Sequence, residues 1–375
     1  MKSIQRVLVV QPFGLGDALF ITPVLRALRT LSGVESVDLL LGSRTEAVFR
    51  NNPHVDKIFS IDKGKWHAGG KGRIFRDALS LWRSLKGRYE LLLDFSMTRE
   101  YGFSGQFFLG IPRRIGFDFN GRGGFLTEVV KLPNGFEARH VVDFYAELVE
   151  LIGLEIENPF LEFYLSKEDR EEAEKILGQS PFNRYIAIAP GGGESWGKDA
   201  VFKRWPLAHF IRSLPLLKER IDFKGVFILG SSSERELGEE IEKNSPVPVV
   251  NLCGKTSLGA SAAILEKALL FFANDGGLIH LAHAQRVPLV AFYGPVDPAV
   301  YGPFPASPEA VPVARQGLPC RPCYSRFRYN SACADRECLT DLPPEEVMEF
   351  LDKKNFWPMV DRHCETHAKK GTGLS

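Results

Sequence analysis

The 375-residue sequence lacks any apolar run close to the ~20 residues that a membrane-spanning helix requires, and its first residues lack the apolar core of a signal peptide. It also lacks an excess of charge of one sign: the net charge of +1 argues against a general nucleic-acid-binding protein. Because 44% of the residues are hydrophobic, an unfolded chain is excluded as well. We therefore expect a folded cytoplasmic protein, for which peripheral contact with a membrane surface stays open.

Strand-like apolar runs alternate with helical patterns along the chain, which is longer than one hydrophobic core usually supports. This alternation predicts the α/β class, with parallel sheets covered by helices on both faces. The runs are RVLVV, SVDLLLG, DKIFSID, ELLLDF and RRIGF, then YIAIAPGGG, GVFILGSSS, PVVNLCG, LLFFANDGG and PLVAFYGP. We predict two Rossmann-like, doubly wound domains that face a central cleft. They cover residues 1–166 and 181–342, with a linker over 167–180 and a C-terminal helix and tail over 343–375.

The first glycine-rich loop lacks the third glycine of a dinucleotide fingerprint. Gly14 and Gly16 follow the first strand, but Leu19 stands where the third glycine belongs. Asp17 enters the helix at the place where a pyrophosphate would be expected. An aspartate at a helix start can cap free N–H groups, and a catalytic carboxylate on a tight glycine turn is the alternative. Both interpretations stay open, and the missing glycine disfavours a dehydrogenase.

The segment APGGGESWGKDAVFKRWP suits an anion better. Three glycines after an apolar strand precede Lys198, Lys203 and Arg204, and a helix is expected to open at Pro206. Backbone N–H groups and an ammonium group together would hold a diphosphate. A surface loop with incidental basic residues is the alternative. The donor-binding glycines predicted here are Gly191 and Gly192.

Two further loops extend the predicted anion site. Asp275, Gly276 and Gly277 lie between an apolar strand and a helix, where Asp275 is expected to cap the helix and the N–H groups behind it to bind an anion. His280 lies one turn into that helix. Glu234 begins another helix, where it either accepts hydrogen bonds from ribose hydroxyls or is an ordinary first-turn acid.

Basic residues are in excess over residues 63–139, which hold 14 Lys and Arg against 7 Asp and Glu, a surplus of 7. The surplus indicates either a site for an acidic substrate or anionic headgroups, or a solvated surface. The predicted acceptor contacts are Gly14, Gly16, Arg113, Arg114 and Arg122.

Four of the six cysteines are grouped with the spacing C-x2-C-x9-C-x4-C. In a cytosolic chain, such a group favours a metal over disulfides. Free thiols remain the preferred interpretation, and a structural zinc ion is the alternative. The four residues are Cys320, Cys323, Cys333 and Cys338.

Five segments together resemble glycosyltransferase family 9, the ADP-heptose:lipopolysaccharide heptosyltransferases. They are VVQPFGLGDALFITPVLRAL, IAIAPGGG…KRWP, CGKTSLGASAAIL, NDGGLIHLAHAQRVPLVAFYGPVDP and CRPCY…CL. The resemblance covers nearly the whole chain. It implies a GT-B architecture, with the acceptor in the N-terminal domain and the sugar nucleotide in the C-terminal domain. It also implies an inverting transfer of heptose from ADP-heptose to a lipopolysaccharide core acceptor, at the cytoplasmic face of the inner membrane.

The resemblance assigns roles to individual residues. Asp17 would be the catalytic base, Lys203 would hold the donor phosphate, and Asp275, Gly277 and His280 would lie against the donor. The family's usual threonine after that aspartate is Gly276 here. Because the chain contains no Asp-x-Asp pair, we expect no divalent metal and no cofactor, with the nucleotide sugar as a substrate. The alternatives are another nucleotide-sugar donor or glycan acceptor, and a nucleotide-binding protein without turnover.

Overall fold

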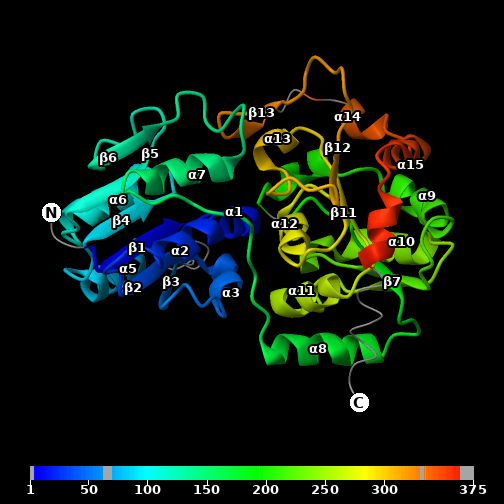
Figure 1. Ribbon diagram of the computed structural model, residues 1–375, viewed down its shortest axis with the longest axis horizontal. Coiled ribbons are helices and arrows are strands. Elements are labelled where there is room, and N and C mark those ends of the chain that lie inside the picture. The colour runs from blue at the N-terminus through cyan, green and yellow to red at the C-terminus, as the bar shows by residue number, and fades with distance from the viewer. Residues whose placement is uncertain (1–3, 62–69, 194, 330–332, 334, 364–375) are drawn as a thin grey trace. The chain divides into compact units, whose positions relative to one another are not determined.

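The computed structural model describes residues 4–61, 70–193, 195–329, 333 and 335–363. The chain divides into two compact units, Met1–Tyr164 and Leu165–Ser375. Each unit is built on a six-stranded sheet in which all neighbouring strands are parallel, with helices packed against it (Figure 1). This confirms the predicted α/β class with two doubly wound parallel sheets.

The sheet of the first unit has the strand order β3-β2-β1-β4-β5-β6. The order reverses between β1 and β4, so the loops that follow these two strands separate at their carboxyl ends, where open α/β sheets bind ligands. The strands are β1 (Arg6–Gln11), β2 (Ser36–Gly42), β3 (Lys57–Ile61), β4 (Leu91–Asp94), β5 (Arg113–Asp118) and β6 (Glu128–Lys131). The helices are α1 (Leu15–Phe20), α2 (Thr22–Leu28), η1 (Ser43–Thr45), α3 (Glu46–Phe49), α5 (Gly70–Leu85), α6 (Arg99–Phe107) and α7 (Val141–Glu150).

The central strands of this sheet are nearly continuous apolar runs because both faces are covered. On one face, Leu8 and Leu92 pack with Leu85 of α5, and Tyr101 of α6 lies against the same cluster. On the other face, Tyr145 of α7 contacts the ring of Phe95, which follows β4, at a centroid distance of 4.7 Å. The two packed faces fix the position of the loops that follow the carboxyl ends of the strands.

The sheet of the second unit has the order β12-β11-β10-β7-β8-β9, which is the same topology with its reversal between β7 and β10. A separate hairpin pairs β13 with β14. The strands are β7 (Tyr185–Ala189), β8 (Gly225–Ile228), β9 (Val249–Asn251), β10 (Phe271–Asn274), β11 (Leu289–Phe292), β12 (Ala310–Val313), β13 (Tyr324–Ser325) and β14 (Arg328–Tyr329). The helices are α8 (Lys167–Gly178), η2 (Gly197–Lys203), α9 (Leu207–Lys218), η3 (Ser232–Glu234), α10 (Arg235–Asn244), α11 (Leu258–Glu266), α12 (Gly277–Ala284), α13 (Pro298–Tyr301), α14 (Glu337–Thr340) and α15 (Pro344–Lys353).

Two peripheral helices pack onto the second sheet's layers. Helix α8 covers most of the segment expected as a linker, and its Arg170 pairs with Glu266 of α11. Helix α15 lies against α9, where Arg212 pairs with Glu345 at 2.7 Å. Val347, Met348 and Leu351 of α15 belong to the core of the unit. Among the described helices, none is both long and apolar enough to cross a bilayer.

Candidate active site

Asp17 lies in the first turn of α1, just beyond the carboxyl end of β1. The N-cap of the helix is Gly14, and Asp17 Oδ2 accepts the Gly14 N–H at 3.2 Å. The capping interpretation is therefore right in kind, although the carboxylate acts from the third helical position rather than from the cap itself. Asp17 is partly exposed, and Gly16 sits in the same turn. A carboxylate held in this way is able to accept a proton from a bound hydroxyl group.

Gln11 and Tyr145 lie beneath Asp17. The fully buried Gln11 donates its amide N–H groups to the Tyr145 hydroxyl at 3.3 Å and to the Asp17 backbone oxygen at 3.4 Å. Burial, and after it the charge of Asp17, raises the pKa of Tyr145 well above its usual range. The phenol therefore stays neutral, and the ionisable group in this turn is the carboxylate.

Asp94 is a second carboxyl group at the carboxyl ends of these strands, and it is not among the site residues predicted from the sequence. It ends β4 opposite Val10 of β1, and only 2% of it is exposed. Its Oδ1 accepts the Ser96 N–H at 2.9 Å, but burial dominates and raises the pKa of Asp94 to about 6. Met97, three residues on, has φ 53°, a left-handed conformation that costs a side-chain-bearing residue about 1–2 kcal/mol. The available signal was an acid at the end of the run ELLLDF.

The structure separates the arginines that were grouped as acceptor contacts. Arg113 and Arg114 begin β5, level with the first residues of β4, so they lie at the opposite edge of the sheet from Asp17. Arg113 Nε pairs with Glu128 at 2.7 Å. Arg114 donates to the backbone oxygens of Phe125 and Ile111 at 2.8 and 2.6 Å. Both guanidinium groups are thus occupied within the unit.

Arg122 has a different position, in the loop that follows the carboxyl end of β5. It is exposed, and its guanidinium lies 5.6 Å from the Phe119 ring. Arg99, at the start of α6, donates to the backbone oxygen of Gly121 at 3.0 Å and is exposed too. Two cationic side chains therefore lie at the same edge of the sheet as Asp17, one of them not anticipated from the sequence.

In the second unit, the loops after β7 and β10 meet at Lys203. Lys203 Nζ lies 2.8 Å from Asp275 Oδ2, and each side chain is only 7% exposed. The sequence predicts Asp275 as the cap of α12, but the N-cap is Gly276, and the aspartate pairs with the lysine instead. The ammonium group also lies 4.8 Å from the centre of the Trp196 ring. The predicted phosphate-binding cation is thus held between a carboxylate and an aromatic face.

Glu234 fixes the glycine loop. Its Oε1 accepts the Gly193 N–H at 3.0 Å, and its Oε2 accepts the Ser231 N–H at 2.9 Å, which completes a capping box. A Cβ atom at Gly191 would lie 1.7 Å from Glu234 Oε1, and one at Gly192 would lie 2.6 Å from the Ala200 backbone oxygen. These contacts confirm Glu234 as a first-turn acid, and its contact with ribose hydroxyls stays a prediction.

Asn274 ties the remaining loops together. Its amide oxygen accepts the Trp205 N–H at 2.9 Å, and its amide nitrogen donates to the Pro190 oxygen at 2.7 Å. Gly276 and Gly277 then lead into α12, with His280 buried one turn along the helix. The structure therefore brings the predicted donor residues together at one edge of the second sheet.

The four grouped cysteines are free thiols, with Cys320 exposed and Cys338 buried. Burial raises the pKa of Cys323, and raises that of Cys338 to about 11, so both thiols are protonated at neutral pH. Within the residues that the structure describes, no three His, Cys, Asp or Glu side chains are arranged to hold a metal ion. The zinc interpretation therefore gains no support from the described residues.

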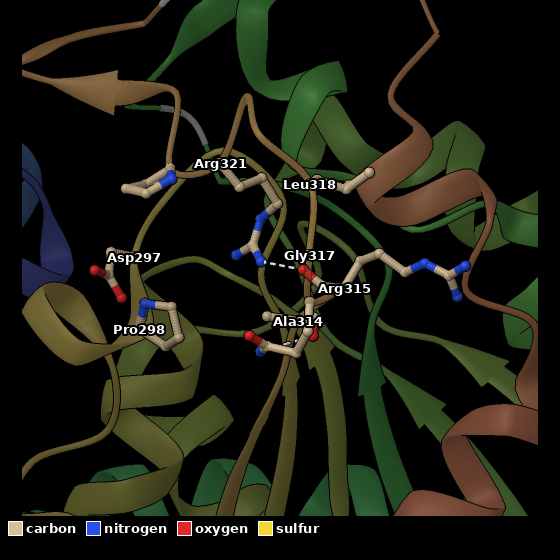
Figure 2. A pocket seen from close by; sticks show the side chains of 9 residues that line it. Asp297, Pro298, Ala314, Arg315, Gly317, Leu318 and Arg321 are labelled. Atoms are coloured by element: carbon tan, nitrogen blue, oxygen red, sulfur yellow. Dashed lines mark hydrogen bonds between the residues drawn. The ribbon is translucent and has the colours of Figure 1, made fainter.

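A cavity of about 220 Å³ lies beside the end of β12 (Figure 2). Arg321 points into it, but donates to the backbone oxygens of Gly294 at 2.5 Å and Arg315 at 2.7 Å. Arg315 in turn pairs with Glu346 at 3.0 Å. Because both guanidinium groups are engaged by the protein, we assign no ligand to this cavity.

Comparison with known proteins places these features in a family. Residues 78–330 match the model of glycosyltransferase family 9 (heptosyltransferase). The chain is 25% identical over 312 residues to lipooligosaccharide heptosyltransferase 2 of Haemophilus influenzae, and the aligned region covers 78% of this chain and 84% of the relative. It is 24% identical over 363 residues to lipopolysaccharide heptosyltransferase 2 of Escherichia coli, covering 92% and 97%.

The solved structure of the Escherichia coli ADP-heptose lipopolysaccharide heptosyltransferase II is similar in fold, with a TM-score of 0.70 and 22% identity. It covers 93% of this chain and 98% of that chain, so the likeness extends through both units. This confirms the predicted GT-B fold class. Since the family model covers more than half of the sequence, the chain belongs to glycosyltransferase family 9 and is a glycosyltransferase.

Proposed function

We propose that the protein transfers heptose from ADP-heptose to a lipopolysaccharide core acceptor, with inversion at the anomeric carbon and without a metal ion. The observation that carries this proposal is a difference between the two units at the point where the strand order of each sheet reverses. In the first unit a carboxylate, Asp17, lies there on a glycine turn, and in the second unit an ammonium group, Lys203, lies there among glycine loops. The names of the relatives supply the sugar and the acceptor.

Asp17 acts as the general base in this proposal. It accepts the proton of the acceptor hydroxyl while the hydroxyl oxygen forms a bond to the anomeric carbon. The bond between that carbon and the diphosphate oxygen breaks on the opposite face, and ADP leaves with the electron pair. A single displacement of this kind inverts the configuration. The negative charge of Asp17 also favours positive charge on the sugar carbon in the transition state.

Lys203 and the glycine loops hold the leaving diphosphate. The ammonium group and the first N–H groups of α12, after Gly276 and Gly277, stabilise the charge that develops on ADP. Gly191 and Gly192 allow the backbone to approach the phosphates. We place Glu234, Asp275 and His280 along the donor as well. Because fixed positive groups supply the charge, activity is expected to survive EDTA, and complete loss of activity with rescue by a divalent ion would contradict this part of the proposal.

The acceptor is expected to bind at the carboxyl edge of the first sheet. Gly14 and Gly16 shape the turn beside Asp17, and the exposed Arg122 and Arg99 suit the acidic sugars and phosphates of a lipid-linked core oligosaccharide. Arg113 and Arg114, at the other edge, are left out of the proposed contact set. This acceptor places the reaction at the cytoplasmic face of the inner membrane.

The test is Asp17→Asn, which keeps an oxygen for the Gly14 N–H but is not a base. We expect kcat for heptose transfer to fall by about 10²–10⁴-fold. The affinity for ADP, measured by calorimetry, is expected to stay unchanged. The matched control is Asp169→Asn, because Asp169 accepts the N-cap N–H of α8 from the same third helical position, at 2.9 Å. If Asp17→Asn transfers heptose at the wild-type rate, the base assignment is wrong.

A different nucleotide sugar is the second candidate, and Gly276 is the observation that favours it. The family's threonine is absent at this position, so one hydroxyl group that could contact the donor is missing. A panel of nucleotide sugars, assayed by nucleotide release and by the mass of the product, separates the two. A clear preference for a donor other than ADP-heptose would replace the proposed substrate and leave the reaction type in place.

A further inference from the structure

An aromatic patch is exposed on α6 and its neighbours. Phe103, Phe107 and Phe108 are 39%, 59% and 37% exposed, and they account for three of the six large apolar side chains that are exposed among the described residues. Trp82 of α5 and Phe125 complete the patch. Apolar side chains that are exposed singly are ordinary, but a contiguous group of this kind marks an interaction surface.

The rings are held in place before any partner arrives. Helix α6 packs closely on its inner side: a Cβ atom at Gly105 would lie 2.9 Å from Leu92 of β4, and one at Gly102 would lie 3.3 Å from Leu126 in the loop before β6. This close approach on one side leaves the phenylalanines on the outer side. Phe103 lies 4.9 Å from the Phe107 ring. Little side-chain entropy is therefore lost when the patch is covered.

The Trp82 end of the patch continues the ordered surface onto α5. Trp82 stacks on Phe108 with centroids 4.3 Å apart and planes inclined by 8°. The Gly87 N–H donates to the Leu109 oxygen at 3.0 Å, so the chain after α5 lies directly beside the end of α6. The two helix ends therefore form one surface.

Basic side chains border this surface. Arg83, Lys86 and Arg88 are exposed around the end of α5, and Arg76 is exposed two turns earlier on the same helix. None of the four forms an ion pair with an acid in the part of the chain that the structure describes. Aromatic rings bordered by unpaired cations are the combination that binds the interface of an anionic bilayer, where the rings enter the headgroup region and the cations meet lipid phosphates.

We propose that the aromatic patch and its basic border dock the protein on an anionic lipid bilayer. The proposal rests on the proposed function in one respect, since a lipid-linked acceptor lies in the membrane and the transferase has to reach it there. A second copy of the chain fits this surface less well. In a two-fold dimer each patch would face its own equivalent, which would bring the like-charged borders together.

The position of the patch agrees with an extended acceptor. Helices α5 and α6 both end at the amino edge of the first sheet, whereas Asp17 lies at the carboxyl edge. The six residues of β1 separate these edges by about 20 Å. An acceptor sugar joined to its lipid through several other sugars bridges a span of this size, so docking and transfer occur at different ends of the same unit.

The experiment measures, by flotation, how much of the full-length protein binds to lipid vesicles. One set of vesicles is phosphatidylcholine alone, and the other contains about a third phosphatidylglycerol; both are tested at low and at high salt. The aromatic variant is Phe103→Gln with Phe107→Gln, and its control is Leu151→Gln, another exposed apolar residue of the same unit. The basic variant is Arg83→Gln with Lys86→Gln and Arg88→Gln. Its control makes the same charge change at exposed lysines of the second unit, Lys175→Gln with Lys243→Gln and Lys354→Gln.

We expect wild-type protein to bind the anionic vesicles and to be released by high salt. The aromatic variant is expected to bind at least tenfold more weakly. The basic variant is expected to bind roughly a hundredfold more weakly, since each base contributes about fivefold. Both controls are expected to bind like the wild type. Melting curves and kcat/KM on an acceptor oligosaccharide freed of its lipid are expected to be equal for all forms.

Wild-type protein that does not bind vesicles, or patch variants that bind as the wild type does, would overturn the proposal. Self-association that the aromatic variant abolishes, without any effect on vesicle binding, would assign the surface to a second copy instead. Vesicle binding as expected, combined with no transfer to any lipopolysaccharide acceptor, would leave the docking surface in place and remove the proposed function. The two proposals therefore fail separately.

Discussion

Asp94 is expected to make the protein less stable as pH rises from 4 to 6. Its carboxyl group is 2% exposed, and burial raises its pKa to about 6 from an ordinary value of 3.8. Between these two values the folded state binds more protons than the unfolded state, so the free energy of unfolding falls with rising pH. A shift of about 2 pKa units corresponds to about 3 kcal/mol, which is the full penalty at neutral pH.

Replacing Asp94 by asparagine removes this penalty. The asparagine oxygen can still accept the Ser96 N–H, so the turn after β4 is expected to remain intact. The variant is expected to melt at the same temperature as the wild type near pH 4 and several degrees higher at pH 7.5, because about 3 kcal/mol corresponds to roughly 6–12 °C as an upper bound in a domain of this size. Melting curves recorded by circular dichroism at half-unit steps of pH measure this difference. Other groups that titrate in this range change both proteins alike, so the difference isolates Asp94. A difference that stays constant, or shrinks, between pH 4 and 7.5 would refute the reasoning.

Two further predictions concern the second unit. Gly191→Ala is expected to lower both the melting temperature and the stabilisation by added ADP, because its Cβ would lie 1.7 Å from Glu234 Oε1. The control Gly276→Ala is expected to change the melting temperature little, since Gly276 has an extended φ of 174° and its Cβ would lie 3.7 Å from the nearest atom. Thermal shift with and without ADP measures both variants. Lys203→Met is expected to cost about 3–5 kcal/mol of unfolding free energy, because it leaves the buried Asp275 carboxylate without its cation. Adding Asp275→Asn to that variant is expected to recover part of the loss in urea unfolding, and a double variant no more stable than Lys203→Met alone would contradict the assigned pairing.

The strands could be predicted where they are buried on both faces. Every apolar run identified from the sequence became a strand, the partly buried outer strands β3 and β9 included. For the central strands the reason is that helices cover both faces and force a continuous apolar pattern. Four described strands were missed: the short β13 and β14 of the hairpin, and β6 and β12, which are outer strands of the two six-stranded sheets. β6 is only partly buried, and β12 contains Pro312, so neither has the pattern of a central strand.

The candidate site divides in the same way. Glycines and acids directly after a buried strand could be placed at the carboxyl edge from sequence alone, which located Asp17, Gly191 and Asp275. Arg113 and Arg114 begin the run RRIGF, so a parallel sheet already places them at the amino ends of the strands, and their prediction as acceptor contacts rested on the basic surplus alone. The pairing of Lys203 with Asp275 is a contact between distant segments, which no local pattern encodes.

That pairing has a consequence for how the donor would be held. Because Lys203 is paired with Asp275, the site offers a bound diphosphate less net positive charge than an unpaired lysine would. Backbone N–H groups, whose direction is fixed by the chain, therefore have to add to the attraction of the ammonium group. This accounts for the tight packing of the loops: Glu234 holds the Gly193 N–H, Asn274 ties two loops together, and Gly191 has no space for a side chain. In the first unit, the same topology places a carboxylate on a partly exposed turn, as the proposed acceptance of a proton requires. In the proposed mechanism, one strand order thus serves two purposes, a preorganised anion site in one unit and an accessible base in the other.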